Sequence, residues 1–191
     1  MTTTTAKLQQ LPFYCVAPVA CSVVIGLIVA HGRVFHLHST AFQFVANSII
    51  AAVFYYLLVL SSRRNAYFGL VLLFVLAVLT TRSTRPALIL RDLLAVGGIG
   101  LSMLLYHRYF RDLVDLKFFY PPILLAGIYG VVNLITSELN FQMVRMFSPA
   151  PLSASFISVA GQSVFLGVLI GFAVGCGIAL NERFAPVATS A

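Results

Sequence analysis

The sequence predicts an all-α, polytopic integral membrane protein with six transmembrane helices. Of its 191 residues, 60% are hydrophobic and only 9% are charged, and the mean hydropathy is +0.99. Soluble domains carry about 25% charged residues, so this composition excludes that class. Apolar runs recur along the chain, and each needs about 20 residues to cross the hydrocarbon core of a bilayer. These runs occupy most of the length and leave little for a separate soluble domain.

We expect a polar tail over residues 1–10, a single transmembrane domain over residues 11–183 and a second tail over residues 184–191. The six predicted spans are 11–30, 40–60, 66–81, 87–106, 123–136 and 153–180. The first run is too long for the apolar part of a signal peptide, so it is expected to be a retained span. Arg63-Arg64 marks a basic turn before the third span, which is short and barely crosses.

Proline positions support the later elements. Pro86 suits the first turn of the fourth span, because proline lacks an N–H that a first turn leaves unpaired anyway. The fourth helix is predicted to continue past the membrane through Arg108–Asp115, where Arg108/Asp112 and Arg111/Asp115 are i,i+4 ion pairs. Pro121-Pro122 then interrupts this extension and opens the fifth span. Residues 137–151 are expected to form a loop.

Basic residues indicate the orientation. The side that carries both termini has seven Lys and Arg residues against five on the other side, which favours both termini in the cytoplasm. The compact loops and the lack of an organelle signal indicate a prokaryotic inner membrane. The net charge of +7 does not indicate nucleic acid, because these residues sit at span ends, where they snorkel to the interface. Tryptophan, the usual marker of the membrane interface, is absent, but five tyrosines fall near span ends: Tyr14, Tyr55, Tyr56, Tyr67 and Tyr106.

The last span contains a small residue at every fourth position. This stripe comprises Ser163, Gly167, Gly171, Gly175 and Ala179. Because no large side chain holds the backbones apart, such a stripe lets two helices approach closely, as in a glycine zipper or a GxxxG crossing. We expect it to seat another helix of the same chain or a second copy, so the predicted partners are the bilayer and a homo-oligomer or other membrane subunits.

Polar residues inside the spans gather on the face opposite the termini. The candidate ligand-binding residues are Asn47, Arg91, Asp92, Asn133 and Gln162. Polar groups in hydrocarbon are costly unless they pair or line a wet cavity, so this clustering predicts a polar vestibule. Hydrogen bonds between helices and snorkelling at span ends would explain the same pattern. Asp92 is the one acid expected within a span, where it could pair with arginine, relay a proton or bind a cation.

Reactive groups are few. His31, His36 and His38 could hold Zn²⁺ or Cu²⁺ in a short extended loop, or could form a pH-responsive loop. The three cysteines lie inside apolar runs and are expected to be small core residues. Metalloprotease, nucleophile-elbow and Walker motifs are missing, so the sequence assigns no catalytic residue and no cofactor, and an enzyme is the less favoured class.

The favoured function is binding or translocation of a small polar or anionic solute. In size and span number the predicted layout resembles the substrate-binding subunits of energy-coupling-factor vitamin transporters. This resemblance rests on layout without a shared motif, and it assigns no residue roles. Two alternatives remain open. The chain could be a non-catalytic accessory or structural subunit of a larger membrane complex, or a membrane sensor whose partner binds the extension after the fourth span.

Overall fold

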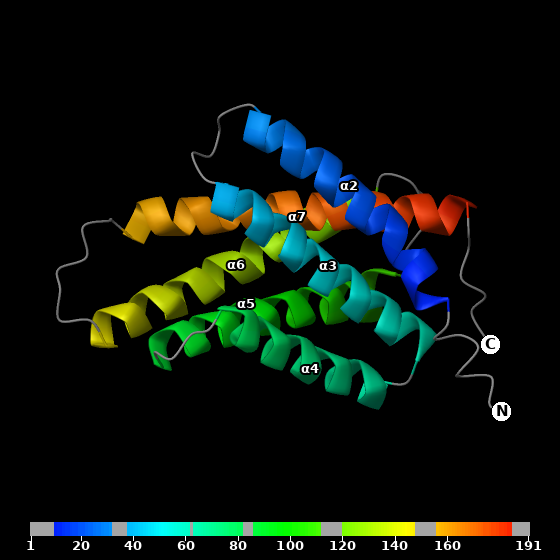
Figure 1. Cartoon of the computed structure of the whole chain (residues 1–191). Helices are drawn as coiled ribbons and strands as arrows, with labels where there is room; N and C mark the ends of the chain where they lie inside the picture. Colours follow the sequence, from blue (N-terminus) through cyan, green and yellow to red (C-terminus); the bar gives the residue numbers. More distant parts are fainter. Residues whose placement is uncertain are drawn as a thin grey trace.

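The computed structural model describes residues 10–31, 38–61, 63–81, 86–111, 120–147 and 156–184, and all regular structure in these ranges is helical. The elements are α2 (Leu11–His31), α3 (His38–Leu60), α4 (Arg63–Thr81), α5 (Pro86–Leu105), η1 (Tyr106–Phe110), α6 (Tyr120–Phe147) and α7 (Phe156–Phe184). Figure 1 shows them as one bundle of elongated helices. The all-helical class predicted from the sequence is confirmed for this part of the chain.

The first four helices begin and end within a few residues of the predicted spans. Their apolar composition favours helix in a low-dielectric environment, where the backbone must satisfy its own hydrogen bonds. Pro86 is the first residue of α5, as expected for a residue that cannot donate a backbone hydrogen bond. The fifth helix differs from the prediction. It begins at Tyr120 and continues to Phe147, so residues 137–147, predicted to be a loop, are helical.

The extension after the fourth span also differs from the prediction. The chain does not continue as a regular α-helix after Leu105 but widens into the π-helical turn η1. There the N–H of Arg111 donates to the carbonyl oxygen of Tyr106, five residues back, over 3.1 Å. Asp112 and Asp115, the acidic partners of the two predicted ion pairs, lie outside the described residues.

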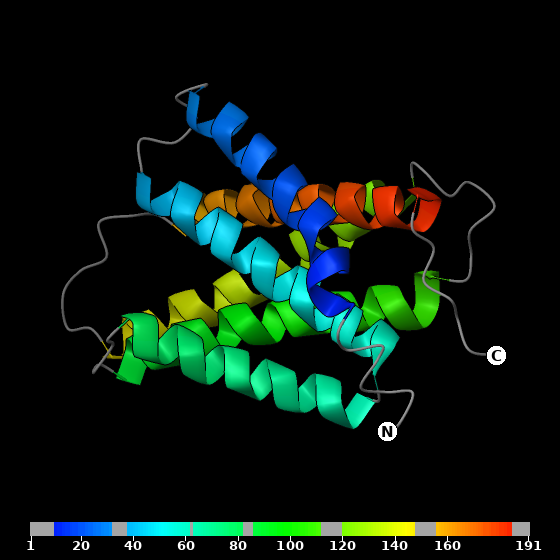
Figure 2. The ribbon, with the colours of Figure 1, turned by 45° about the vertical axis from the view of Figure 1, so that its right-hand side comes forward.

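Successive helices alternate in direction, so the start of α2 and the end of α7 lie at the same end of the bundle (Figure 1). The helix α7 packs against α2, α3 and α6, whereas α4 packs against α3 and α5. Figure 2 shows α4 at one edge of the bundle. In the same view, α2 runs across the bundle close to α7. The buried core lies between α3, α5, α6 and α7, around residues such as Phe54, Met103, Leu125 and Val174.

The outer surface is strongly apolar. Large side chains stand exposed on α2, α4 and α6, among them Leu27, Phe68 and Val131, and Phe68 is 72% exposed. Monomeric soluble proteins rarely leave continuous apolar patches of this kind uncovered. Among the described residues, four helical segments are long and apolar enough to cross a membrane: Leu11–Val29, Leu93–Phe110, Tyr120–Leu139 and Ala160–Phe184. These segments suggest a membrane-embedded protein.

Candidate functional site: a buried tyrosine cluster beside a proline break

The small-residue stripe of α7 lies against the backbone of α6. A Cβ added at Gly171 would collide with the carbonyl group of Leu125, and one added at Gly175 would lie 2.5 Å from Cα of Pro122. One added at Gly167 would lie 2.9 Å from the carbonyl oxygen of Tyr129. The contacts run in opposite order along the two helices, so α6 and α7 pack antiparallel with their backbones touching. Glycine permits this approach because it has no side chain.

The other face of α7 carries a second close contact. Gly177 lies two residues after Gly175, and two residues turn an α-helix by about 200°, so these glycines face opposite sides. A Cβ at Gly177 would collide with the backbone of Pro18 in α2. The two helices therefore touch at a point where α2 contains a buried proline.

Pro18 interrupts the hydrogen bonding of α2. A residue in an α-helix donates its N–H to the carbonyl four residues earlier, and proline has no N–H to donate. The carbonyl of Tyr14 therefore lacks its usual partner. Asn181, one turn beyond Gly177 on α7, fills that position: its Nδ2 donates to the carbonyl oxygen of Tyr14 over 2.6 Å. A neighbouring helix thus satisfies the backbone group that the proline leaves unpaired.

The same amide reaches a second acceptor. Nδ2 of Asn181 also donates to the hydroxyl oxygen of Tyr56 on α3 over 2.6 Å. The Tyr56 ring in turn stacks on Tyr14, with ring centroids 5.4 Å apart and an interplanar angle of 24°. One buried side chain therefore connects α2, α3 and α7. Both hydrogens of the Asn181 amide therefore have acceptors, and burying this NH₂ group leaves no donor without a hydrogen bond.

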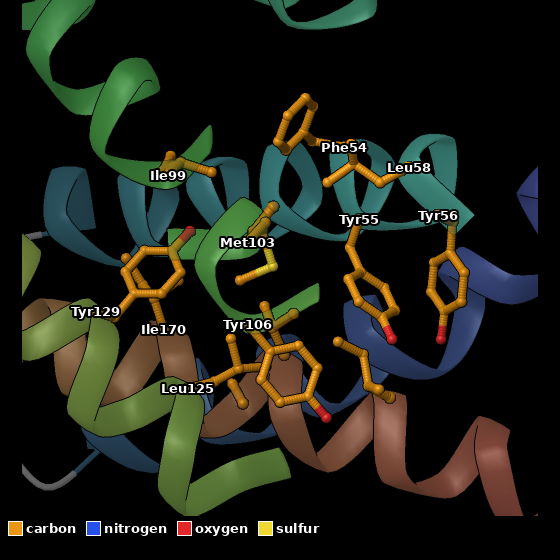
Figure 3. Close-up of a cluster of buried hydrophobic side chains, with 14 of the residues drawn as sticks. Phe54, Tyr55, Tyr56, Leu58, Ile99, Met103, Tyr106, Leu125, Tyr129 and Ile170 are labelled. Atoms are coloured by element: carbon orange, nitrogen blue, oxygen red, sulfur yellow. The ribbon is translucent and has the colours of Figure 1, made fainter. Parts of the chain in front are cut away.

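Four buried tyrosines gather around this connection, and we call Tyr14, Tyr55, Tyr56 and Tyr106 the tyrosine cluster. Tyr55 packs edge-on against Tyr56 at 5.1 Å between centroids, and Tyr106 lies 5.9 Å from Tyr55. Figure 3 shows Tyr55 and Tyr56 reaching from α3 with their hydroxyl groups side by side. Edge-on and offset contacts of this kind stabilise aromatic pairs beyond the area they bury.

Ionisable groups surround the tyrosine cluster. The π-helical turn η1 supplies Tyr106 and then His107, whose ring lies 6.3 Å from Tyr55. Glu182 on α7 and Arg111 after η1 lie close enough for their charges to act on Tyr55 and Tyr106. π-Helical turns recur at functional sites in proteins. The arrangement therefore places hydroxyl, amide, imidazole, carboxylate and guanidinium groups at the end of the bundle where α2 begins and α7 ends.

The residues predicted to line a vestibule have varied environments. Asn133 is half-buried in α6, donates from Nδ2 to the carbonyl oxygen of Tyr129 over 2.9 Å, and faces Gly167 of α7. Asn47 is half-buried in α3, and the Gln162 side chain is exposed on α7. Arg91 and Asp92 fall in the second turn of α5, and their side chains lie outside the described part of the structure.

The remaining predicted residues divide in the same way. Ser163 is half-buried and Ala179 is buried in α7. His36 lies outside the described residues, whereas His31 ends α2 and His38 begins α3, with side chains that are likewise outside them. The metal site at these histidines stays a prediction. In the ranges that the structure describes, no group of three His, Cys, Asp or Glu side chains could hold a metal ion.

Sequence reasoning missed the tyrosine cluster, because it considered these tyrosines only for their positions near span ends. Tyr14, Tyr55, Tyr56 and Tyr106 are buried between helices, whereas Tyr67 is exposed on α4. Two signals in the sequence pointed to the cluster. Pro18 within an apolar run demands a substitute donor for the carbonyl four residues earlier, and Asn181 is a polar residue at the end of an apolar span.

One further tyrosine is buried but lies apart from the cluster. Tyr129 on α6 is 1% exposed, and within the described residues its hydroxyl has no hydrogen-bond partner. Figure 3 shows its hydroxyl pointing toward Ile99 and Met103 of α5, at a distance from the hydroxyls of Tyr55 and Tyr56.

Comparisons with known proteins give no match for this chain among protein-family models, curated proteins or solved structures.

Proposed function

We propose that the chain is an integral membrane protein in which all six helices cross the bilayer, with both termini in the cytoplasm of a prokaryotic inner membrane. Support comes from helix length: α3 has 23 residues and α4 has 19. At about 1.5 Å per residue α3 exceeds the hydrocarbon thickness of about 30 Å and α4 comes close to it. The alternating helix directions and the apolar outer surface support the same topology.

Within that bundle we propose a site that binds or passes a small polar or anionic solute. The observation that carries this proposal is the tyrosine cluster, buried with Asn181 in a bundle whose outer surface is apolar. Polar groups inside a membrane protein are costly, and those that persist concentrate where solutes bind or pass. Tyrosine hydroxyls donate and accept hydrogen bonds from rigid rings, which suits recognition of a polar molecule.

This proposal moves the recognition site from the predicted face to the opposite end of the bundle. The sequence placed the vestibule at the starts of α3, α5 and α7, whereas the cluster lies at their ends. The roles follow from position. Tyr55 and Tyr106 supply hydroxyl groups, Arg111 supplies positive charge for an anionic solute, and Asn181 holds the surrounding helices together.

Native mass spectrometry of protein gently extracted from its own membrane tests the proposal. We expect a bound small molecule on the wild type and about tenfold lower occupancy in Tyr55→Phe and Tyr106→Phe, because each variant removes a hydroxyl at unchanged ring volume. Tyr67→Phe is the matched control, since Tyr67 is an exposed tyrosine on α4. A wild type without any bound molecule, or occupancy unchanged in both cluster variants, would contradict the proposal.

A second candidate function is a non-catalytic accessory subunit of a larger membrane complex. The observation that favours it is that Asn181 donates both amide hydrogens to groups within the bundle, so none is left for a solute. A cluster of this kind also serves simply to join helices. The same measurement separates the two candidates, because an accessory subunit should be extracted together with unlike chains and without a small molecule.

A further inference from the structure

The first two turns of α2 differ from the rest of that helix in how they are attached. Residues 11–17 precede Pro18, and the hydrogen bond that would join Tyr14 to residue 18 is missing. On the far side of the break, the hydroxyl of Ser22 donates to the carbonyl oxygen of Pro18 over 2.7 Å. Serine bonds of this type bend helices. The backbone of α2 is therefore weakest at Pro18.

Pro18 itself is fixed in place. Its backbone lies against Gly177 of α7, and eight residues later Gly26 lies against Phe44 of α3, 3.3 Å from where a Cβ would stand. The part of α2 that follows the proline is therefore held by two neighbours. Residues 11–17 end at this fixed point, where one backbone hydrogen bond is missing, so Pro18 is suited to act as a hinge for them.

Residues 11–17 lie over the Tyr56 side of the tyrosine cluster and contribute Tyr14 to it. The ring of Tyr14 stacks on Tyr56, and Leu11 and Cys15 pack against the same buried core. The outer side of the segment is open, since Phe13 is 65% exposed and Val16 is also exposed. The polar attachment that the described structure gives this segment is the bond from Asn181 to the Tyr14 carbonyl.

We propose that residues 11–17 form a lid that turns about Pro18, and that Asn181 is the catch that keeps this lid closed over the tyrosine cluster. When the hydrogen bond from Asn181 to the Tyr14 carbonyl breaks, the lid turns and Tyr14 leaves the face of Tyr56. The cluster is then open at the end of the bundle where α2 begins. The value of the lid for function rests on the proposed solute site. The hinge itself is a property of α2 and α7, so its test needs no solute.

The chain carries its own reporters for this movement. It has three cysteines, of which Cys15 lies in the lid and Cys21 lies on the same helix beyond the hinge. Both are half-buried and free. A protein with Cys21→Ala and Cys176→Ala keeps only Cys15, and one with Cys15→Ala and Cys176→Ala keeps only Cys21. The labelling rate of each with a membrane-permeant maleimide in lipid vesicles reports opening on one side of Pro18.

We expect Asn181→Leu to raise the labelling rate of Cys15 about tenfold, because the variant removes two hydrogen bonds at similar volume. Cys21 should label at an unchanged rate. Adding Pro18→Ala should return Cys15 labelling close to its original rate, because the N–H of the new residue can bond the Tyr14 carbonyl within the helix. This suppression separates a hinge from a general loosening of the bundle.

Three results would overturn the proposal. If Asn181→Leu left the labelling rate of Cys15 unchanged, the Asn181 amide would not be what keeps the lid closed. Equal acceleration at Cys15 and Cys21 would show that the whole helix loosens. Acceleration that Pro18→Ala does not suppress would place the movement elsewhere. A working lid with no molecule detected by mass spectrometry would leave the hinge intact and remove the solute site, so the two proposals fail separately.

Discussion

Single buried polar groups join helices and complete backbone hydrogen bonding in this bundle. Asn181 takes the place of a peptide N–H that Pro18 cannot provide, and it also holds the Tyr56 hydroxyl. Ser48 and Ser102 satisfy their hydroxyls within their own helices, by donating to the carbonyls of Phe44 and Gly98. Each of these groups is buried and paired, as an apolar environment requires.

Tyr129 differs from these groups, and it supports a prediction about stability. Its hydroxyl is buried without a hydrogen-bond partner in the part of the chain that the structure describes. Removing an unsatisfied buried hydroxyl relieves a desolvation cost, so Tyr129→Phe should stabilise the protein by about 1 kcal/mol. Thermal unfolding in detergent measures this difference.

Tyr56→Phe is the matched variant for that experiment, because its hydroxyl accepts a hydrogen bond from Asn181. It should destabilise the protein by about 1 kcal/mol, since it leaves a buried N–H without its acceptor. If Tyr129→Phe also destabilised the protein, its hydroxyl would have to hold a group that the bundle needs.

At the scale of elements, α7 organises the bundle because it presents glycines on two faces. Gly171 and its neighbours in the stripe meet α6, and Gly177 meets α2. This arrangement lets one helix touch two others through their backbones, at distances that side chains would forbid. Helix α4 has no such contact with α7 and remains at the edge of the bundle.

Paired glycine substitutions test this account. A Cβ at Gly171 would collide with the backbone of Leu125, whereas a Cβ at Gly127 of α6 would meet no atom within 4 Å. Gly171→Ala should therefore cost about 3 kcal/mol of stability, because the two backbones must separate. Gly127→Ala should be neutral or stabilise by about 0.5–1 kcal/mol, because alanine favours helix over glycine.

Both variants can be compared by unfolding in a denaturing detergent, and Gly127→Ala is the control for a methyl group added to a helical glycine. Equal stability of the two variants would show that α6 and α7 can separate freely. In that case the close approach would not be what holds the bundle together.

At the scale of the whole molecule, the alternating helices predict the side on which each end of the chain lies. The proposed six spans would place both termini in the cytoplasm and the connection between α4 and α5 on the opposite side. In a cysteine-free protein, Thr3→Cys and Ser190→Cys should resist an impermeant maleimide in intact cells and react in inverted vesicles. Ser83→Cys should show the reverse pattern.

The outcomes of that experiment have different meanings. Labelling of the two termini from opposite sides would contradict an even number of spans, and α3 or α4 would then fail to cross. A complete reversal would keep six spans and invert the orientation, which would mean that the small excess of Lys and Arg on the termini side does not set it.

The amino-acid sequence by itself determined the helices of this protein and most of their ends. Helix formation is local, since apolar composition, proline and the missing partners of backbone groups act within a few residues of each other. Pro86 could therefore be placed at the start of α5. The end of α6 was missed by about eleven residues, because the polar residues after Thr136 resemble a loop although they continue the helix.

The tertiary structure decided which helices meet and which polar groups are buried. The stripe on α7 is readable from its spacing, but its partner, α6, follows from the order in which six helices pack. The four clustered tyrosines share their position near span ends with Tyr67, yet they are buried because of how α2, α3 and α5 are rotated about their axes. Asn181 and Tyr14 are 167 residues apart in the chain. Only packing brings such groups together. The geometry of a helix determines distances between its own residues, but the rest of the fold determines which helices lie beside it.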